Sequence, residues 1–217
     1  MSVNWTEIFI DTLKFLVGLF WGNSHVPSKF FFPIVGDLWM LLCLYWLISA
    51  LKMKALKSRE SFARRLSYVF PVAIGVFLIF NPRTHYSWLG IRFAPDTTAL
   101  AVTGVVATAA GVAFAMWARY ILGENWSGVV SIRQDHELIR IGPYRTMRHP
   151  IYTGMLLAFL GTALVVGEVR ALLGLLIVTL GFYRKARQEE VFLSREFGVG
   201  FESHAKHTGM FLPKIFA

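Results

Sequence analysis

Long apolar runs, separated by short charged or proline-containing segments, make up most of this chain. Three of them, 34–51, 67–80 and 98–122, approach or reach the length that an α-helix needs to cross a bilayer. A fourth apolar region, 151–183, is interrupted by one polar break at 167–170. That pattern is typical of a helical hairpin whose two arms are each somewhat short of roughly twenty residues. The runs together predict an all-α, polytopic membrane helical bundle of about five transmembrane helices.

Both ends of the chain carry mixed polar and apolar patterns. Glu7, Asp11, Lys14 and Gly18 recur at helical spacing in an otherwise apolar segment. This spacing predicts an N-terminal amphipathic helix, which we expect in the membrane interface rather than across it. In the tail, 191–217, phenylalanines alternate with charged residues, which predicts a C-terminal helix that caps the cytoplasmic end of the bundle.

Small residues form ridges on two of the expected helices. Ridges of this kind let helix backbones approach closely in lipid. The first consists of Ala107, Gly111 and Ala115, and the second of Gly154, Ala158 and Thr162. We expect these two helices to pack against each other.

Composition and charge narrow the class of protein. Hydrophobic residues make up 55% of the chain and charged residues only 16%, whereas soluble domains carry roughly 25% charged residues. The formal net charge is +9, but Lys and Arg concentrate beside the apolar runs, so we expect contact with membrane lipids and no nucleic acid. The basic loop at 52–65 is placed in the cytoplasm by the positive-inside rule.

The cysteine and histidine content and the distribution of apolar runs also limit the possible metal sites and the number of domains. One cysteine, Cys43, excludes a disulfide or a cysteine-based zinc site within one chain. His204 and His207 have helical spacing but no third ligand nearby, so no metal is expected. We expect a single integral membrane domain over 1–217, with N-terminal helices in 1–122 and a catalytic core in 123–217.

Two charged strips bracket the hairpin. The first, 142–154, runs directly into its first arm, and the second, 184–190, follows its second arm. The two ends of a hairpin lie on one side of the membrane, which by alternation from the basic loop is the cytoplasmic side. Ionisable groups at a membrane boundary are costly unless compensated, so these strips mark a candidate site.

A set of motifs lies in the two strips and after them. It consists of Gly142-Pro143-Tyr144, Arg148-His149-Pro150-Ile151-Tyr152-Thr153-Gly154, Glu189-Glu190, Leu193, Phe197-Gly198 and Pro213. Over roughly residues 122–213, this set resembles the isoprenylcysteine carboxyl methyltransferase family and its bacterial and archaeal relatives. Phe201 and His204 depart from it, since the family tends to have tyrosines at these positions.

The resemblance implies an enzyme that transfers a methyl group from S-adenosylmethionine to a lipophilic or prenylated acceptor from the bilayer. It implies catalytic roles for Arg148, Glu189 and Glu190. The residues of the cofactor site would be Tyr144, His149, Pro150, Tyr152 and Glu190, and the substrate site would use Arg184 and Arg187, just past the hairpin. Separately from the resemblance, Asn125 and Trp126 follow the longest apolar run and are further candidates for the substrate site.

The chemistry of the residues is consistent with this implication. Arginine binds a carboxylate through a planar fork, and glutamate accepts from an ammonium or a ribose hydroxyl. A carboxylate acceptor is already ionised at neutral pH and needs no base. An amine or thiol acceptor would need one, for which His149, Glu189 or Glu190 could serve. No glycine-rich nucleotide loop is present, so a doubly wound methyltransferase fold is not supported.

Several alternatives remain open from the sequence. Arg148 could contact phospholipid headgroups, His149 could cap a helix, and Tyr144 and Tyr152 could be interface aromatics. Glu189 and Glu190 are not both expected to be buried, so one should face water or pair with an arginine. The same scaffold could serve a phospholipid N- or small-thiol S-methyltransferase. Two further hypotheses remain: a membrane sterol-type reductase that uses NADPH, and a membrane scaffold without enzymatic activity.

Overall fold

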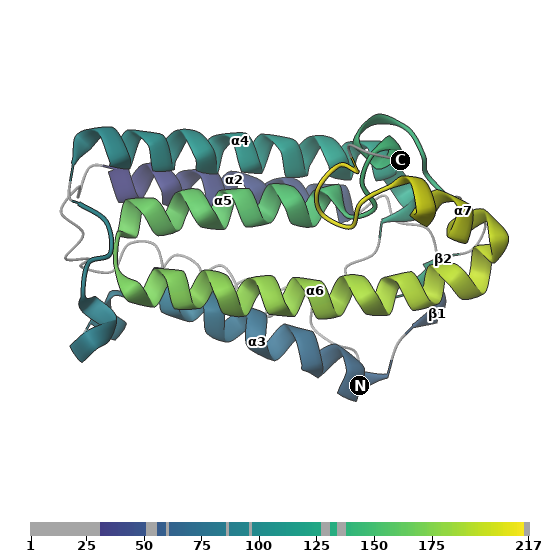
Figure 1. Ribbon diagram of the computed structural model, residues 1–217, viewed down its shortest axis with the longest axis horizontal. Helices are drawn as coiled ribbons and strands as arrows, with labels where there is room; N and C mark the ends of the chain where they lie inside the picture. The colour runs from purple at the N-terminus through teal and green to yellow at the C-terminus, as the bar shows by residue number, and fades with distance from the viewer. Residues whose placement is uncertain are drawn as a thin grey trace.

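The computed structural model describes residues 31–50, 56–59, 61–85, 87–95, 97–126, 131–133 and 138–214. Its helices are α2 (Phe31–Ala50), α3 (Phe62–Phe80), α4 (Thr98–Leu122), α5 (Pro150–Val166), α6 (Val169–Phe197) and α7 (Val199–His207). A short antiparallel ladder pairs β1 (Leu56–Arg59) with β2 (Ser131–Arg133). The all-α bundle is thereby confirmed for these residues (Figure 1). The predicted N-terminal amphipathic helix lies outside them.

Three helices in the described part of the chain are long and apolar enough to cross a membrane, namely α2, α3 and α4. Helix α4 has the predicted bounds, and α2 begins at Phe31 with Pro33 in its first turn, where a missing N–H costs nothing. Helix α3 begins at Phe62 rather than at residue 67, so Arg64 and Arg65 lie on its first turns. These spans make the chain an integral membrane protein.

The hairpin has arms of unequal length. Helix α5 has 17 residues and is short, as predicted, and it ends at Gly167, whose φ of +67° favours glycine. Helix α6 has 29 residues and continues to Phe197, past the predicted end of the second apolar arm at residue 183. The strip 184–190 consists mostly of good helix formers, which let the helix run on past the apolar part. For the same reason the first residues of the predicted tail helix belong to α6, and only α7 follows as a separate helix.

Two helix pairs are packed through glycines. A Cβ atom added to Gly111 of α4 would lie 2.4 Å from the backbone nitrogen of Ala158 on α5, which shows how closely the two backbones approach. This confirms the predicted packed pair. The sequence reasoning missed a second pair, α3 with α6, where a Cβ atom on Gly75 would lie 2.6 Å from the carbonyl oxygen of Gly174.

Aromatic rings fill the region where the two pairs meet. Phe182 of α6 lies 6.3 Å from Phe159 of α5, whose ring lies 4.3 Å from Trp39 of α2. Trp39 contacts Phe80 of α3 at 5.9 Å, and its indole N–H donates to Thr162 Oγ1 at 3.0 Å. We call Phe182, Phe159, Trp39 and Phe80 the aromatic row. In Figure 1, α2, α4 and α5 lie on one side of this region, and α3 and α6 on the other.

The polar break of the hairpin is a helix cap. Arg170 is fully buried and donates to the carbonyl oxygens of Leu78, Ile79 and Asn81 at the end of α3, at 2.8–3.2 Å. Its Nε donates to the buried carboxylate of Glu168. Carbonyls at a helix end have no partner within the helix, so this arginine supplies one. The turn that carries it lies at the end of the bundle opposite α7 (Figure 1).

Candidate active site

The open end of the hairpin is closed by the tail of the chain. After α7, the backbone runs parallel to the segment before α5, and the N–H groups of Arg148 and His149 donate to the carbonyls of Gly209 and Met210 at 2.9 and 3.0 Å. The N–H of Gly209 donates in return to Thr146 at 3.1 Å. The segment that enters α5 is thus fixed to residues about sixty positions further along the chain.

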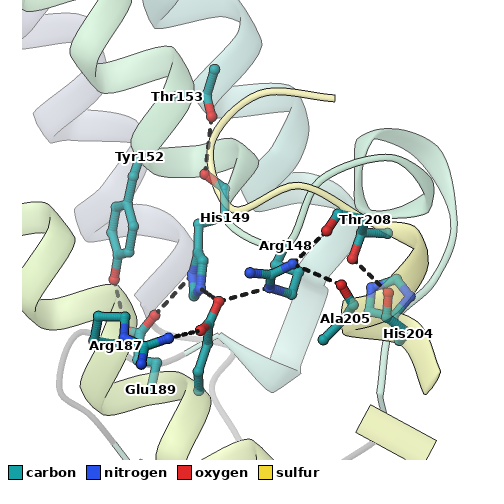
Figure 2. Close-up of polar contacts among 10 residues, drawn as sticks. Arg148, His149, Tyr152, Thr153, Arg187, Glu189, His204, Ala205 and Thr208 are labelled. Carbon is teal, nitrogen blue, oxygen red and sulfur yellow. Dashed lines mark hydrogen bonds and ion pairs between the residues drawn. The ribbon is translucent and has the colours of Figure 1, made fainter. Parts of the chain in front are cut away.

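Arg148 joins helix α6 to this tail. Its Nε donates to Glu190 Oε1 at 2.7 Å, and its Nη1 donates to the carbonyls of Ala205, at 3.2 Å, and of Thr208 (Figure 2). The alternative in which Arg148 serves phospholipid headgroups is not supported, because Nε and Nη1 are both used inside the protein. Arg148 therefore holds the site together, whatever else its guanidinium binds.

His149 lies between the two carboxylates of the acidic pair. Its side chain is buried, with Nδ1 3.4 Å from Glu189 Oε2 and Nε2 3.3 Å from Glu190 Oε1. Burial alone would lower the pKa of His149, but the hydrogen bonds to Glu189 and Glu190 outweigh it and raise this pKa above its ordinary value. The arrangement favours an imidazolium held by two carboxylates. The His149 side chain makes no cap hydrogen bond to α5, so the alternative in which His149 caps this helix is not supported either.

The two glutamates differ in exposure. Burial would raise the pKa of Glu190, but hydrogen bonds from His149 and Arg148 outweigh burial and lower it to about 2. The pKa of Glu189 is also lowered, because the hydrogen bond from His149 and the charge of Lys185 outweigh burial. The Glu190 side chain is 10% exposed and that of Glu189 23% exposed. As expected, the pair is not buried equally, and Glu190 is the one that pairs with Arg187, at 3.3 Å.

Both tyrosines are buried, so neither is an interface aromatic. Tyr152 stacks between His149, at 5.5 Å, and Phe182, at 5.1 Å, and its hydroxyl donates to Glu189 Oε1 at 2.6 Å. Tyr152 thereby connects the polar cluster to the aromatic row. Burial raises the pKa of Tyr144, with a further contribution from the charge of Glu189. Pro150 occupies the first turn of α5, where its fixed φ suits the helix.

The predicted substrate residues are less well placed. Arg184 is exposed on α6, and Arg187 is 60% exposed although it reaches Glu190. Trp126 lies 4.5 Å from the Arg119 guanidinium and 6.1 Å from the ring of Trp46, rather than against the acidic pair. The side chain of Asn125 lies outside the described part of the chain.

Sequence reasoning missed two side chains that lie against this cluster. Phe211 of the tail contacts the rings of His149 and Tyr152 at 6.2 and 6.4 Å, and its carbonyl accepts from Thr153 Oγ1. No local signal distinguishes Phe211 from the other phenylalanines of the tail. Lys185 lies over the ring of Tyr152, with Nζ 5.6 Å from the ring centroid. Its position one helical turn before Glu189 could have indicated it.

The chemistry of the cluster suits a cationic, amino-acid-like ligand. Two carboxylates can accept from an ammonium or a ribose hydroxyl, and aromatic faces attract cations such as a sulfonium. Arginine and lysine lie close enough to receive a carboxylate group. Among the described residues, no group of three or more His, Cys, Asp or Glu side chains is arranged to hold a metal ion.

The fold and this cluster define a helical membrane protein with a charged site at the open end of its hairpin. Residues 99–199 match the family model described as phospholipid methyltransferase. The chain is 32% identical to protein-S-isoprenylcysteine O-methyltransferase of Schizosaccharomyces pombe over 96 residues, which cover 43% of this chain and 41% of that protein. It is 33% identical to a probable protein-S-isoprenylcysteine O-methyltransferase of Oryza sativa subsp. indica, over 43% of this chain and 50% of that protein.

A third relative, protein-S-isoprenylcysteine O-methyltransferase A of Arabidopsis thaliana, is 30% identical over 43% of this chain and 49% of its own length. The match thus spans half or less of each of these relatives. The resemblance to the isoprenylcysteine carboxyl methyltransferase family is thereby confirmed, since the curated relatives carry this name and the family model covers the hairpin and both charged strips.

Proposed function

We propose that this protein transfers a methyl group from S-adenosylmethionine to the carboxylate of an isoprenylcysteine-like acceptor. One observation carries the proposal: a buried His149, flanked by Glu189 and Glu190, lies at the end of an apolar hairpin and next to the aromatic row. The site is thereby polar at one end and apolar at the other. Such a site suits a water-soluble donor and a lipid-borne acceptor.

The residues of the cluster divide into binding and positioning roles. Glu189 is the more exposed carboxylate and is available to the ammonium or ribose of the donor. Tyr152 and Phe211 provide aromatic walls for the donor. Tyr144 and Pro150 shape the segment that leads into α5, which carries Tyr152. Arg148 and Glu190 position the tail over the site. Residues 123–217 would then be the catalytic core of a single membrane domain.

The donor supplies, when bound, a methyl group on a sulfonium; an acceptor carboxylate oxygen forms the new C–O bond, and the electrons of the broken C–S bond remain on sulfur. An ionised acceptor needs no proton removed, so the protein aligns the reactants and excludes water. Alignment of this kind supplies up to about 7–11 kcal/mol of the barrier. The aromatic row and the tail exclude water from two sides of the cluster.

A second candidate is methyl transfer to an amine, as in a phospholipid headgroup, which the description of the matching family favours. A protonated amine requires a general base, and a small thiol requires one too. Both ring nitrogens of His149 lie within 3.4 Å of the Glu189 and Glu190 carboxylates, so neither nitrogen is free to take a proton from an acceptor. We therefore favour the carboxylate acceptor. No contact among the described residues favours an NADPH-dependent reductase.

We place the site on the cytoplasmic side. Lys185 lies over the ring of Tyr68, so the site is level with the first turns of α3, where Arg64 and Arg65 are exposed. Basic residues at the end of a span favour the cytoplasmic side.

The test is transfer of a labelled methyl group by the detergent-purified protein to three acceptors supplied separately: N-acetyl-S-farnesylcysteine, an amine-bearing phospholipid and a small alkyl thiol. A methyl ester releases labelled methanol in alkali, whereas an N-methyl or thioether product does not. Alkali-labile product is the expected result. Label that is stable in alkali would move the assignment to an amine or thiol acceptor, and no transfer to any of these acceptors would refute the proposal.

A further inference from the structure

We propose that Lys185 recognises the carboxylate of the acceptor and so selects acidic over neutral lipophilic molecules. This inference rests on the proposed methyl transfer and adds to it the residue that receives the acceptor's charged group.

The ammonium group of Lys185 is held between two aromatic rings. Its Nζ lies 5.4 Å from the ring centroid of Tyr68 on α3 and 5.6 Å from that of Tyr152 on α5. Cations within about 6 Å of an aromatic ring are attracted by its electron-rich face. Tyr68 is buried. The lysine of α6 is therefore fixed where three helices meet, rather than extended into solvent.

This position is the junction between the polar cluster and the aromatic row. Phe182, Lys185 and Glu189 follow one another at one-turn spacing on α6, and Tyr152 contacts the first by stacking and the last by a hydrogen bond of 2.6 Å. An amphiphile with its carboxylate at Lys185 would extend its apolar chain toward the apolar part of α6, which precedes Lys185. Its charged end would lie beside Glu189 and His149.

Other cations of the cluster are less suited to this role. Arg148 uses Nε and Nη1 to join Glu190 to the tail. Arg187 is 60% exposed and lies on the far side of Glu190, where it makes an ion pair. The charge of Lys185 already favours the ionised form of Glu189, so it acts on carboxylates at this location.

The test compares two ligands that differ only in charge, N-acetyl-S-farnesylcysteine and its carboxamide. Each competes with a labelled acceptor for the wild type, Lys185→Met and Lys185→Gln, and Arg195→Met serves as a control that removes an exposed charge from the same helix. A charged hydrogen bond is worth roughly tenfold to hundredfold in affinity. We expect the wild type and the control to prefer the carboxylate by that factor, and both Lys185 variants to lose the preference.

Binding of S-adenosylmethionine separates the possible failures. The Lys185 variants should retain it, with a raised KM for the acceptor and a smaller change in kcat. A carboxylate preference that persists in a variant that still binds S-adenosylmethionine overturns the role of Lys185 while the methyl transfer stands. A wild type that neither binds S-adenosylmethionine nor transfers methyl refutes the proposed function, and the inference with it.

Discussion

Arg148 and Glu190 are 42 positions apart in the sequence and joined by a hydrogen bond of 2.7 Å between Nε and Oε1. Through this bond the start of α5, the last two turns of α6 and the end of α7 meet at one point, because Arg148 also donates to Ala205 and Thr208. The pair is only 13% and 10% exposed, so it is shielded from water and salt. The site is therefore assembled by its own charged residues.

Replacing Arg148 by alanine should disrupt this assembly. Removing one partner of a buried ion pair costs roughly 3–5 kcal/mol, because the other charge stays desolvated. We expect a lower thermal unfolding midpoint in detergent and loss of S-adenosylmethionine binding. Arg148→Lys should recover part of the stability, since it keeps the charge but not the planar fork. Arg145→Ala, which removes an exposed arginine of the same segment, is the control. Equal midpoints for all three variants would contradict this role.

Stability should depend on pH through His149. Its folded pKa is raised above the ordinary 6.5, so the stabilisation by its charge is complete below 6.5 and is lost as the pH rises through the folded pKa. Glu190 acts in the opposite direction: its stabilisation is complete above 4.5 and is lost as the pH falls toward about 2. We measure the difference in thermal unfolding midpoint between the wild type and His149→Gln as a function of pH. This difference should be largest between pH 4.5 and 6.5 and should decrease in alkali. A difference that does not change with pH would show that folding does not shift the pKa of His149.

The close approach of α4 and α5 predicts that Gly111 tolerates no side chain. A Cβ atom there would lie 2.4 Å from the backbone nitrogen of Ala158, and backbone cannot move aside as a flexible side chain could. Gly111→Ala should therefore lower stability by roughly 1–3 kcal/mol, the usual cost of overpacking. Ala110→Leu, at an exposed position of the same helix, should change it little. Thermal unfolding in detergent measures both, and equal midpoints would mean that the helices can move apart freely.

Arg170 should be needed for folding although it lies far from the site. Arg170→Met leaves the Glu168 carboxylate buried without this partner and deprives the last carbonyls of α3 of their donor. We expect a loss of roughly 3–5 kcal/mol. The double variant Glu168→Gln, Arg170→Met should be more stable than Arg170→Met alone, because it buries no net charge. Yields of monodisperse protein after detergent extraction give the comparison, and a double variant no better than the single one would contradict the buried-charge explanation.

The hydropathy pattern predicted most helices because membrane spans are determined by local composition. The bounds of α4 and the packed pair of α4 with α5 follow from apolar length and from small residues at one-turn spacing. The length of α6 could not be predicted in this way, because hydropathy alone gives no sign that its charged second part is helical. The pairing of α3 with α6 was missed, because Gly174 and Gly181, which both pack against α3, are seven residues apart and form no continuous ridge in the sequence.

The site residues were predicted where a motif carried them. Arg148, His149, Tyr152 and the acidic pair do lie together, because the two ends of a hairpin must meet. The partners of Arg148 could not be predicted, since they are backbone carbonyls of the tail. Lys185 was one of three cations between 184 and 187, and its position one helical turn before Glu189 is the signal that could have distinguished it.

Calorimetric titration of the detergent-purified protein with S-adenosylmethionine, S-adenosylhomocysteine and NADPH tests the central claim most directly. We predict binding of both adenosyl ligands, at least about tenfold weaker in Glu189→Gln, and no binding of NADPH. Binding of NADPH without either adenosyl ligand would contradict the assignment as a methyltransferase.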